Sequence, residues 1–258
     1  SENLPAINAG LQAMMIQALR AGVELSHLYE NEALAQACQA ALDRAIRYAQ
    51  KHSQRFPAKA GEIKAGDKQA AALLTIAGVL DPQTANSQCL AVDGAKGFST
   101  FYGYYMLRAM AMAGNYQGAL DVIRTYWGAM LDVGATTFWE DFNMEWLPNA
   151  ARIDELVPAG KKDIHGDYGA YCYQGFRHSL CHGWASGPTS WLSEFVLGVQ
   201  VVEPGCRTIR ITPHLGDLQW VEGSFPTPYG DIQIRHEKEA NGDIKSQIEA
   251  PKEIRIIQ

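Results

Sequence analysis

The sequence contains few cysteines, and they are scattered. Its 258 residues include five, at Cys38, Cys89, Cys172, Cys181 and Cys206. An odd number without CxxC spacing does not indicate a disulfide framework. The chain also lacks paired CxxC, HExxH, phosphate-loop and calcium-loop spacings. We therefore expect neither a cofactor nor a bound metal.

Long apolar runs and basic runs are absent as well. No apolar stretch approaches the roughly 18 to 20 residues of a membrane span, and residues 1–5 lack the layout of a signal peptide. A net charge of −6 without a basic run makes nucleic acid and anionic membranes poor partners. We expect a soluble protein with a neutral ligand. Its compartment stays open between cytoplasm, periplasm and exterior, because a signal could have been removed.

Helical periodicity recurs through the first half of the chain. Apolar residues return at helical spacing within residues 5–22, 30–49, 67–80, 99–113 and 116–131. Asp67 is placed to cap the third helix, which Asp81-Pro82 would end. Short turns between alanine-rich helices indicate successive helical hairpins in a toroid or bundle.

The period changes from 3.6 to 2 near residue 199. Residues 208–212, 231–236 and 253–256 alternate as strands do, and Asn241-Gly242 is a strong hairpin signal. We therefore predict a helical domain at 1–198 and a small antiparallel β-domain at 199–258. Between the two patterns, residues 134–187 show little periodicity, which is typical of a functional segment.

One candidate site is centred on Glu140. Phe138, Trp139 and Phe142 flank it, and a partly desolvated carboxylate beside apolar rings suits an acid/base catalyst or a sugar clamp. The alternative is an ordinary salt-bridged glutamate at the edge of a core. Glycoside hydrolysis commonly needs two carboxyl groups, and the adjacent Asp141 is poorly placed to face the same pocket. Glu140 would then need a partner from elsewhere.

A second candidate site spans residues 178–188. Trp184 offers a flat face for the apolar side of a sugar, and His182 can donate or accept a hydrogen bond. The alternative is a glycine-rich helix entry with a packed tryptophan. In the preceding acidic loop, His165 or Asp167 could reach a ligand or simply order the loop.

A metal site built from cysteine and histidine is a weaker hypothesis for the same stretch. His178 and His182 would bind one ion together only on a continuous helix, with Cys172 and Cys181 as further ligands. No paired motif supports that arrangement.

Four stretches together resemble the bacterial α-L-rhamnosidases of glycoside hydrolase family 78. They are Gly134-Ala135-Thr136-Thr137-Phe138-Trp139-Glu140, residues Phe176 to Pro188, Pro204-Gly205, and Ile211 to Leu218. The resemblance implies a mainly α plus β fold, with part of an (α/α)6 six-hairpin toroid followed by a small antiparallel β-sandwich. It also implies hydrolysis of terminal α-L-rhamnosides with inversion.

The resemblance also suggests roles for single residues. It makes Glu140 the general base that activates water, and places Trp139 and His182 at the border of the rhamnose pocket. We expect Asp141, His165 and Trp184 to contact substrate with them.

The resemblance implies an incomplete enzyme, because the family's general acid lies before the helices seen here. We expect a C-terminal fragment with half the toroid, little activity alone, and possible self-association through its exposed apolar face. Two alternatives stay open. One is a non-catalytic carbohydrate-binding or assembly module, and the other is a different sugar-active (α/α)6 enzyme.

Overall fold

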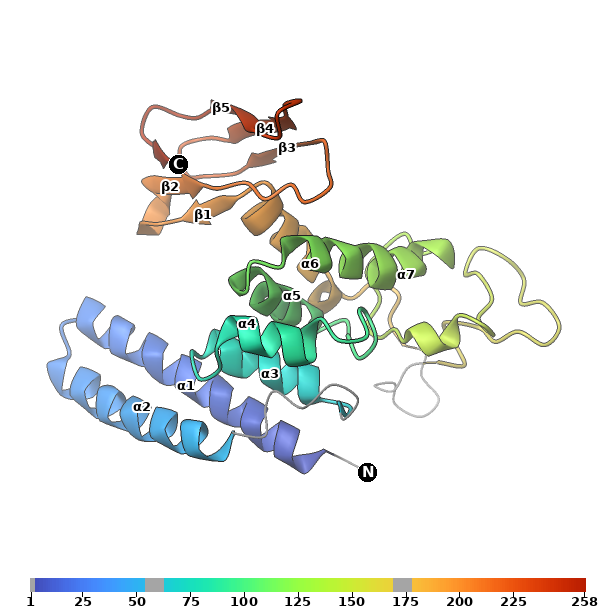
Figure 1. The fold of residues 1–258 in the computed structure, drawn as a ribbon, viewed down its shortest axis with the longest axis horizontal. Coiled ribbons are helices and arrows are strands. Elements are labelled where there is room, and N and C mark those ends of the chain that lie inside the picture. The colour runs from blue at the N-terminus through green and yellow to red at the C-terminus, as the bar shows by residue number, and fades with distance from the viewer. Residues whose placement is uncertain (1–2, 54–62, 169–177) are drawn as a thin grey trace. The chain divides into compact units, whose positions relative to one another are not determined.

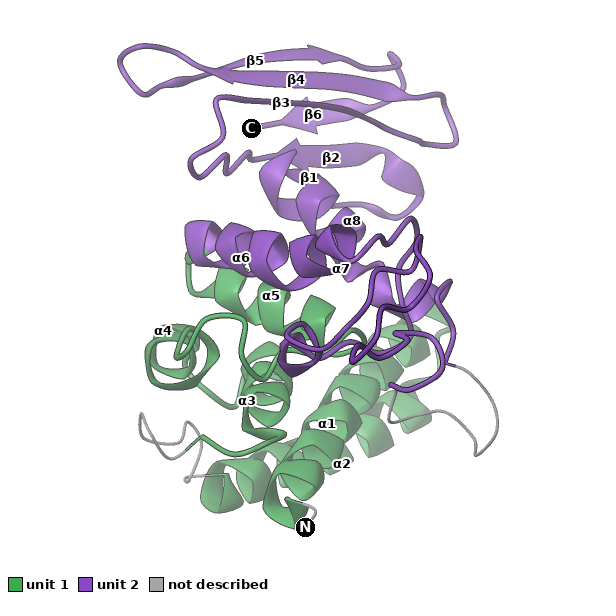
Figure 2. Cartoon of the chain, turned by 90° about the vertical axis from the view of Figure 1, so that its right-hand side faces the viewer, with its two compact units in different colours: residues 1–115 green, residues 116–258 purple. Residues whose placement is uncertain are grey.

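The computed structural model describes residues 3–53, 63–168 and 178–258. The chain divides into two compact units, residues 1–115 and 116–258 (Figures 1 and 2). Cys172, Phe176 and Arg177, which the metal hypothesis and the family resemblance use, lie outside the described residues. None of the described helices is long and apolar enough to cross a membrane.

The first unit is helical. Its elements are α1 (Leu4–Leu28), α2 (Glu32–His52), α3 (Asp67–Ile76), α4 (Pro82–Ala85), the π-helical turn η1 (Asn86–Leu90) and α5 (Gly103–Met112). The helices α1 and α2 lie side by side as a hairpin (Figure 1). The helix α1 continues past Gly22, where a Cβ would lie 3.2 Å from Cys38 Sγ. Glycine at this position lets α2 approach α1 closely.

The predicted cap of the third helix is wrong by one position. The N-cap of α3 is Gly66, with φ of 87°, and Asp67 is the first helical residue. Asp67 is fully buried, and its carboxylate accepts from Asn3 Nδ2 at 2.8 Å and from the Lys64 N–H at 2.9 Å. The carboxylate thus ties the chain before α1 to the turn before α3, a long-range contact that local sequence does not reveal.

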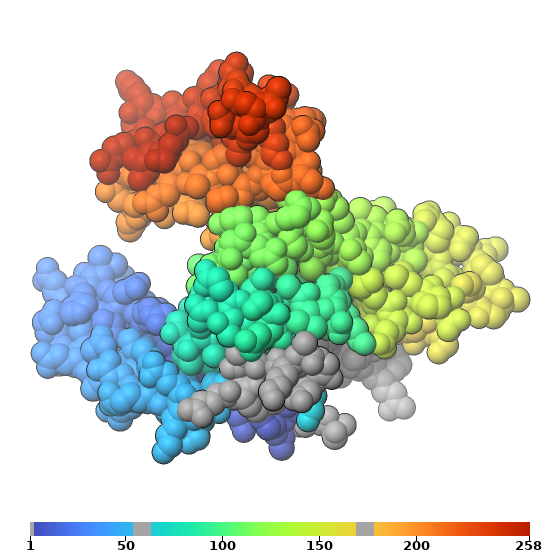
Figure 3. Space-filling view, viewed as in Figure 1, coloured from blue at the N-terminus to red at the C-terminus, as the bar shows by residue number. Residues whose placement is uncertain are grey.

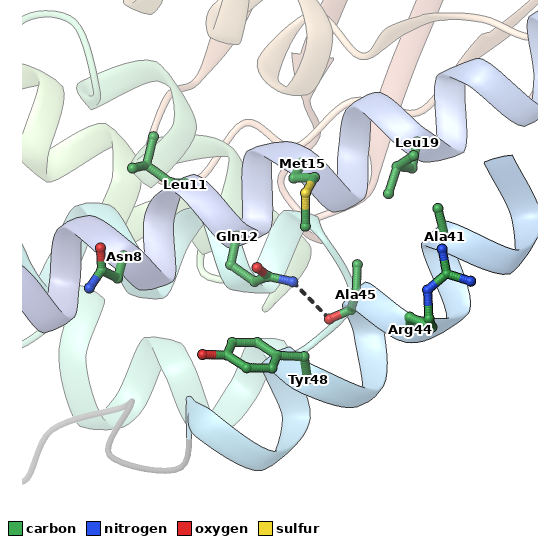
Figure 4. Close-up of a pocket in the computed structure, with 9 residues that line it drawn as sticks. All are labelled: Asn8, Leu11, Gln12, Met15, Leu19, Ala41, Arg44, Ala45 and Tyr48. Carbon is green, nitrogen blue, oxygen red and sulfur yellow. Dashed lines mark hydrogen bonds between the residues drawn. The ribbon is translucent and has the colours of Figure 1, made fainter.

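Small residues dominate the core of the first unit. Its buried cluster consists of Ala6, Ala13, Ile16, Leu42, Ala45, Ala49, Ala70, Leu73, Leu74 and Ala77. An open groove of about 750 Å³ runs between α1 and α2, where Gln12 Nε2 donates to the Ala45 carbonyl at 3.0 Å (Figure 4). Leu11 and Met15 line this groove and stay 59% and 46% exposed. One face of α1 is therefore apolar and uncovered within this unit.

The second unit begins with a helix that contains a π-helical turn. Its parts are α6 (Tyr116–Val122), η2 (Ile123–Trp127) and α7 (Gly128–Asp132). A long irregular stretch follows, as the sequence predicts, with the 3-10 turns η3 (Met144–Trp146) and η4 (Gly183–Ala185). The segment near residues 151–162 projects from the unit (Figures 1 and 3). The helix α8 (Gly187–Trp191) and the π turn η5 (Leu192–Val196) then lead to the strands.

Among the described residues, six strands form two three-stranded sheets. The first contains β1 (Val199–Val201), β2 (Thr208–Ile211) and β6 (Arg255–Ile257), and the second β3 (Trp220–Phe225), β4 (Ile232–Lys238) and β5 (Ile244–Glu249). The predicted hairpin is confirmed, with Gly242 at φ of 91° between β4 and β5. One pair, β2 with β6, is parallel, because the chain returns to the first sheet after β5. The α plus β class is confirmed.

Alternating isoleucines hold the two sheets together. Ile209 and Ile211 of β2 are buried in one cluster with Ile232 and Ile234 of β4. Residues 212–219, which connect β2 to β3 along the chain, pack on α6. Here Arg124 donates twice to the Asp217 carboxylate, at 2.7 and 3.0 Å. The conspicuous sequence around Pro213 therefore fastens the β-domain to the helix that opens this unit.

Candidate functional site

Two segments far apart in sequence pair along their main chains at the candidate site. The Glu140 N–H donates to the Ser179 carbonyl at 2.8 Å, and the His182 N–H donates to the Phe138 carbonyl at 2.7 Å. The Thr137 hydroxyl also donates to the Leu180 carbonyl. The two candidate sites that the sequence suggested separately therefore lie side by side.

The Glu140 side chain is held by the same pairing. Its Oε2 accepts from the Ser179 N–H at 2.8 Å, and the side chain is half-buried. A hydrogen bond from a main-chain amide to a carboxylate is charge-assisted and fixes the direction of the carboxylate. The arrangement suits a group that must meet a water molecule in one orientation.

Trp184 lies against the Glu140 main chain. Its Nε1 donates to the Glu140 carbonyl at 2.7 Å, and its ring lies 4.3 Å from that of His182, centroid to centroid. Trp184 remains 38% exposed. An anchored indole with an accessible face is well suited to packing against the apolar face of a sugar ring.

The neighbours of Glu140 in sequence are more deeply buried. Trp139 is fully buried and packs edge-on against Phe142, with ring centroids 6.0 Å apart. Its Nε1 has no hydrogen-bond partner among the described residues. Asp141 is 9% exposed. Trp139 thus lies in the core beside Glu140, and only a small part of Asp141 reaches the surface.

His165 is brought to the site through a second histidine, His178. The two rings meet edge to face at 6.2 Å, and His178 Nδ1 lies 2.9 Å from the Tyr168 carbonyl. Burial is the main cause that lowers the pKa of His178, while Asp141 and Glu140 raise it and His165 lowers it further. The hydrogen bond to the Tyr168 carbonyl also raises the pKa of His178, so burial outweighs three contributions of the opposite sign.

The sequence pattern places His178 in the second candidate site and suggests a role of its own for it only as a metal ligand. His178 directly precedes Ser179 in the sequence, which could have indicated that it lies near the site. The sequence does not show that Ser179 matters, because its hydrogen bond to Glu140 joins two distant segments. Residues 178–182 are not helical, so His178 and His182 do not share a helix face. Within residues 3–53, 63–168 and 178–258, no group of three histidine, cysteine or acidic side chains is placed to hold a metal ion.

The last part of the chain matches a known family. Residues 198–256 match the family described as bacterial alpha-L-rhamnosidase C-terminal domain. An alpha-L-rhamnosidase of Alteromonas sp. (strain LOR) is 31% identical over 110 residues, which are 42% of this chain and 10% of that protein.

Two solved structures share the fold over nearly the whole chain. The family 78 rhamnosidase of Bacillus sp. GL1 is 25% identical, with a TM-score of 0.67 over 93% of this chain and 25% of its own. The Streptomyces avermitilis alpha-L-rhamnosidase, solved with L-rhamnose, is 17% identical, with a TM-score of 0.70 over 95% of this chain and 22% of its own. The chain thus spans about a quarter of these relatives.

Proposed function

Because the chain corresponds in sequence and in fold to the C-terminal part of family 78 α-L-rhamnosidases, we propose that it carries the general base of an inverting α-L-rhamnosidase. The observation that supports this most is the Glu140 carboxylate, oriented by the Ser179 N–H beside an exposed indole. The carboxylate takes a proton from water while that water attacks the anomeric carbon opposite the leaving oxygen.

The general acid comes, in this proposal, from outside these 258 residues. Inverting enzymes keep their two carboxyl groups roughly 6.5 to 9.5 Å apart so that a water fits between them. Asp141 is adjacent to Glu140 and largely buried, which is poor placement for that partner. The proposal is also supported by the share of the solved relatives, about a quarter, that this chain spans.

The remaining candidate residues would contact the sugar or shape its pocket. Trp184 would pack against the ring of rhamnose and His182 would bind a hydroxyl, because both side chains reach the surface beside Glu140. The rest of the pocket wall would come from the buried Trp139 and Asp141 and from the half-buried His165. We also propose a domain boundary near residue 199, which the family match at 198–256 supports.

Complementation of a solved relative tests the assignment of the base. We would join this chain to the part of the Bacillus sp. GL1 rhamnosidase that precedes the matched region, and assay an aryl α-L-rhamnoside. We expect hydrolysis with inverted product by NMR, and a fall in kcat of roughly 10²- to 10⁴-fold in Glu140→Gln.

The matched control is Glu145→Gln, since Glu145 is an exposed carboxylate five residues further along. It should keep its activity. Full activity in Glu140→Gln would rule out the proposed base. Binding of L-rhamnose by calorimetry with no hydrolysis in the joined protein would favour the alternative of a carbohydrate-binding module.

We also propose that the isolated chain associates with itself through the apolar face of α1. Leu4, Leu11 and Leu25 are each more than half exposed along that helix, which is unusual for a surface left in water. Sedimentation velocity across a range of concentrations should show a dimer or larger species. A monomer at all concentrations would contradict this.

A further inference from the structure

The His178 ring ties the main chain on one side of the site. The ring is fully buried, and its Nδ1 lies 2.9 Å from the Tyr168 carbonyl. A carbonyl oxygen only accepts, so Nδ1 carries a proton and donates it to this bond. Two further rings hold the imidazole edge-on, Trp146 at 6.1 Å and His165 at 6.2 Å. The ring is thus fixed by one hydrogen bond and by packing on two sides.

The residue after His178 is the one that orients Glu140. Ser179 uses both of its main-chain groups, since its N–H donates to Glu140 Oε2 and its carbonyl accepts from the Glu140 N–H. A shift of a few tenths of an ångström at Ser179 therefore moves the N–H group that donates to the Glu140 carboxylate. Distances of this kind decide catalytic geometry.

The far end of the same segment is tied independently. The His182 N–H donates to the Phe138 carbonyl at 2.7 Å, and Trp184 Nε1 donates to the Glu140 carbonyl at 2.7 Å. These contacts do not involve the imidazole of His178. Loss of that ring therefore loosens the segment at its Ser179 end and leaves its sugar-facing end attached.

We propose that His178 is a positioning residue for Glu140, which holds the Ser179 N–H in place against the carboxylate by anchoring the main chain to the Tyr168 carbonyl. The catalytic part of this inference rests on the proposed function, in which Glu140 is the base. The structural part does not, because the contact between Ser179 and Glu140 exists whatever the reaction.

Amide hydrogen exchange of Ser179 tests the proposal directly on this chain. In His178→Leu we expect the Ser179 amide to exchange at least about tenfold faster, because the Ser179 N–H is no longer held against Glu140 Oε2. His178→Asn should restore most of the protection, since the asparagine Nδ2 occupies the place of Nδ1 and can donate to the Tyr168 carbonyl. His178→Gln, whose amide nitrogen extends to the place of Nε2, should not.

The matched control for general destabilisation is His214→Leu. His214 is a half-buried histidine of the second unit, and it stacks on Tyr116 at 3.6 Å rather than on the site. This variant should leave the Ser179 amide unchanged. Unchanged Ser179 protection in folded His178→Leu would overturn the proposal. If that variant does not fold, equal protection in His178→Asn and His178→Gln would overturn it.

Activity provides a second, separable readout in the joined rhamnosidase. We expect His178→Leu to lower kcat at least about tenfold with KM within about twofold, because the contacts at His182 and Trp184 persist, and His178→Asn to recover most of kcat. A change in KM alone would overturn the positioning role. If Glu140→Gln kept full activity while Ser179 exchange responded as expected, only the assignment of the base would fail.

Discussion

The Ser179 main-chain N–H donates to Glu140 Oε2 at 2.8 Å, joining residues 39 positions apart. Carbonyl and amide groups on either side of this bond pair the same two segments, so the main chain of Ser179 contributes to the orientation of the carboxylate. A main-chain donor has less freedom than a lysine or arginine. The geometry of Glu140 therefore depends on the register of the two segments.

Substitution of Trp184 should weaken sugar binding in two steps. Trp184→Phe keeps an aromatic face but loses the hydrogen bond to the Glu140 carbonyl, and Trp184→Ala loses both. Because such stacking contributes about 0.5–1.5 kcal/mol, we expect the Kd of L-rhamnose to rise roughly tenfold in Trp184→Ala and less in Trp184→Phe, by calorimetry.

The control for Trp184 is Trp220→Ala. Trp220 is a 56% exposed tryptophan of β3 that packs against Arg235 of β4, in a sheet that contains none of the residues proposed to bind sugar. Its removal should leave the Kd unchanged. An equal Kd in wild type and Trp184→Ala would show that the indole does not face the sugar.

Gly216→Ala should destabilise the second unit. Gly216 has φ of 55°, and a Cβ there would lie 2.6 Å from Gln117 Oε1, which accepts from the Asp217 N–H. The substitution adds backbone strain and displaces this hydrogen bond, so we expect a loss of about 2–3 kcal/mol in the free energy of unfolding by urea titration.

Gly205→Ala separates the two contributions to that loss. Gly205 has φ of 74°, but a Cβ added there would meet no atom within 4 Å beyond its immediate chain neighbours. The substitution should cost about 1 kcal/mol, from backbone strain alone. Equal losses at the two positions would mean that the contact with α6 contributes nothing.

Stability should fall as the pH drops below about 6.5. Burial lowers the pKa of His178, His214 and His236 from the ordinary value of 6.5. Below that value the unfolded chain binds protons that the folded chain does not, so the unfolded state gains. Aspartates ionise near 3.9 in unfolded chains and contribute little above about pH 5. Urea midpoints should be level above about pH 7.5 and decline toward about pH 5.

His236 allows a specific check of this pH dependence. The ring is fully buried, with Nε2 3.1 Å from the Leu197 carbonyl and Nδ1 2.7 Å from Ser246 Oγ. His236→Gln should lower stability at about pH 8 and flatten the decline toward about pH 5, because it removes one of the three histidines whose pKa is lowered by burial. An unchanged slope would assign the pH dependence to other groups.

Local patterns predicted most elements but not their ends. Helical spacing identified α1 and α2, and alternation identified β2 and β4, because a single buried face repeats at 3.6 or at 2 residues. The cap at Gly66 was missed because the Asp67 carboxylate is used by Asn3, far away in sequence. Side chains that serve a distant partner are not free to follow local rules.

The sequence by itself determined the secondary-structure types, the irregular segment between them, and Glu140 with His182 and Trp184 as candidates, since these follow from periodicity, composition and family resemblance. Only the tertiary structure decided that residues 137–140 pair with 179–182, that Trp139 is buried, and that His178 is buried against the Tyr168 carbonyl. Hydrogen bonds between distant segments depend on where the chain returns, and that is set by packing of the whole unit.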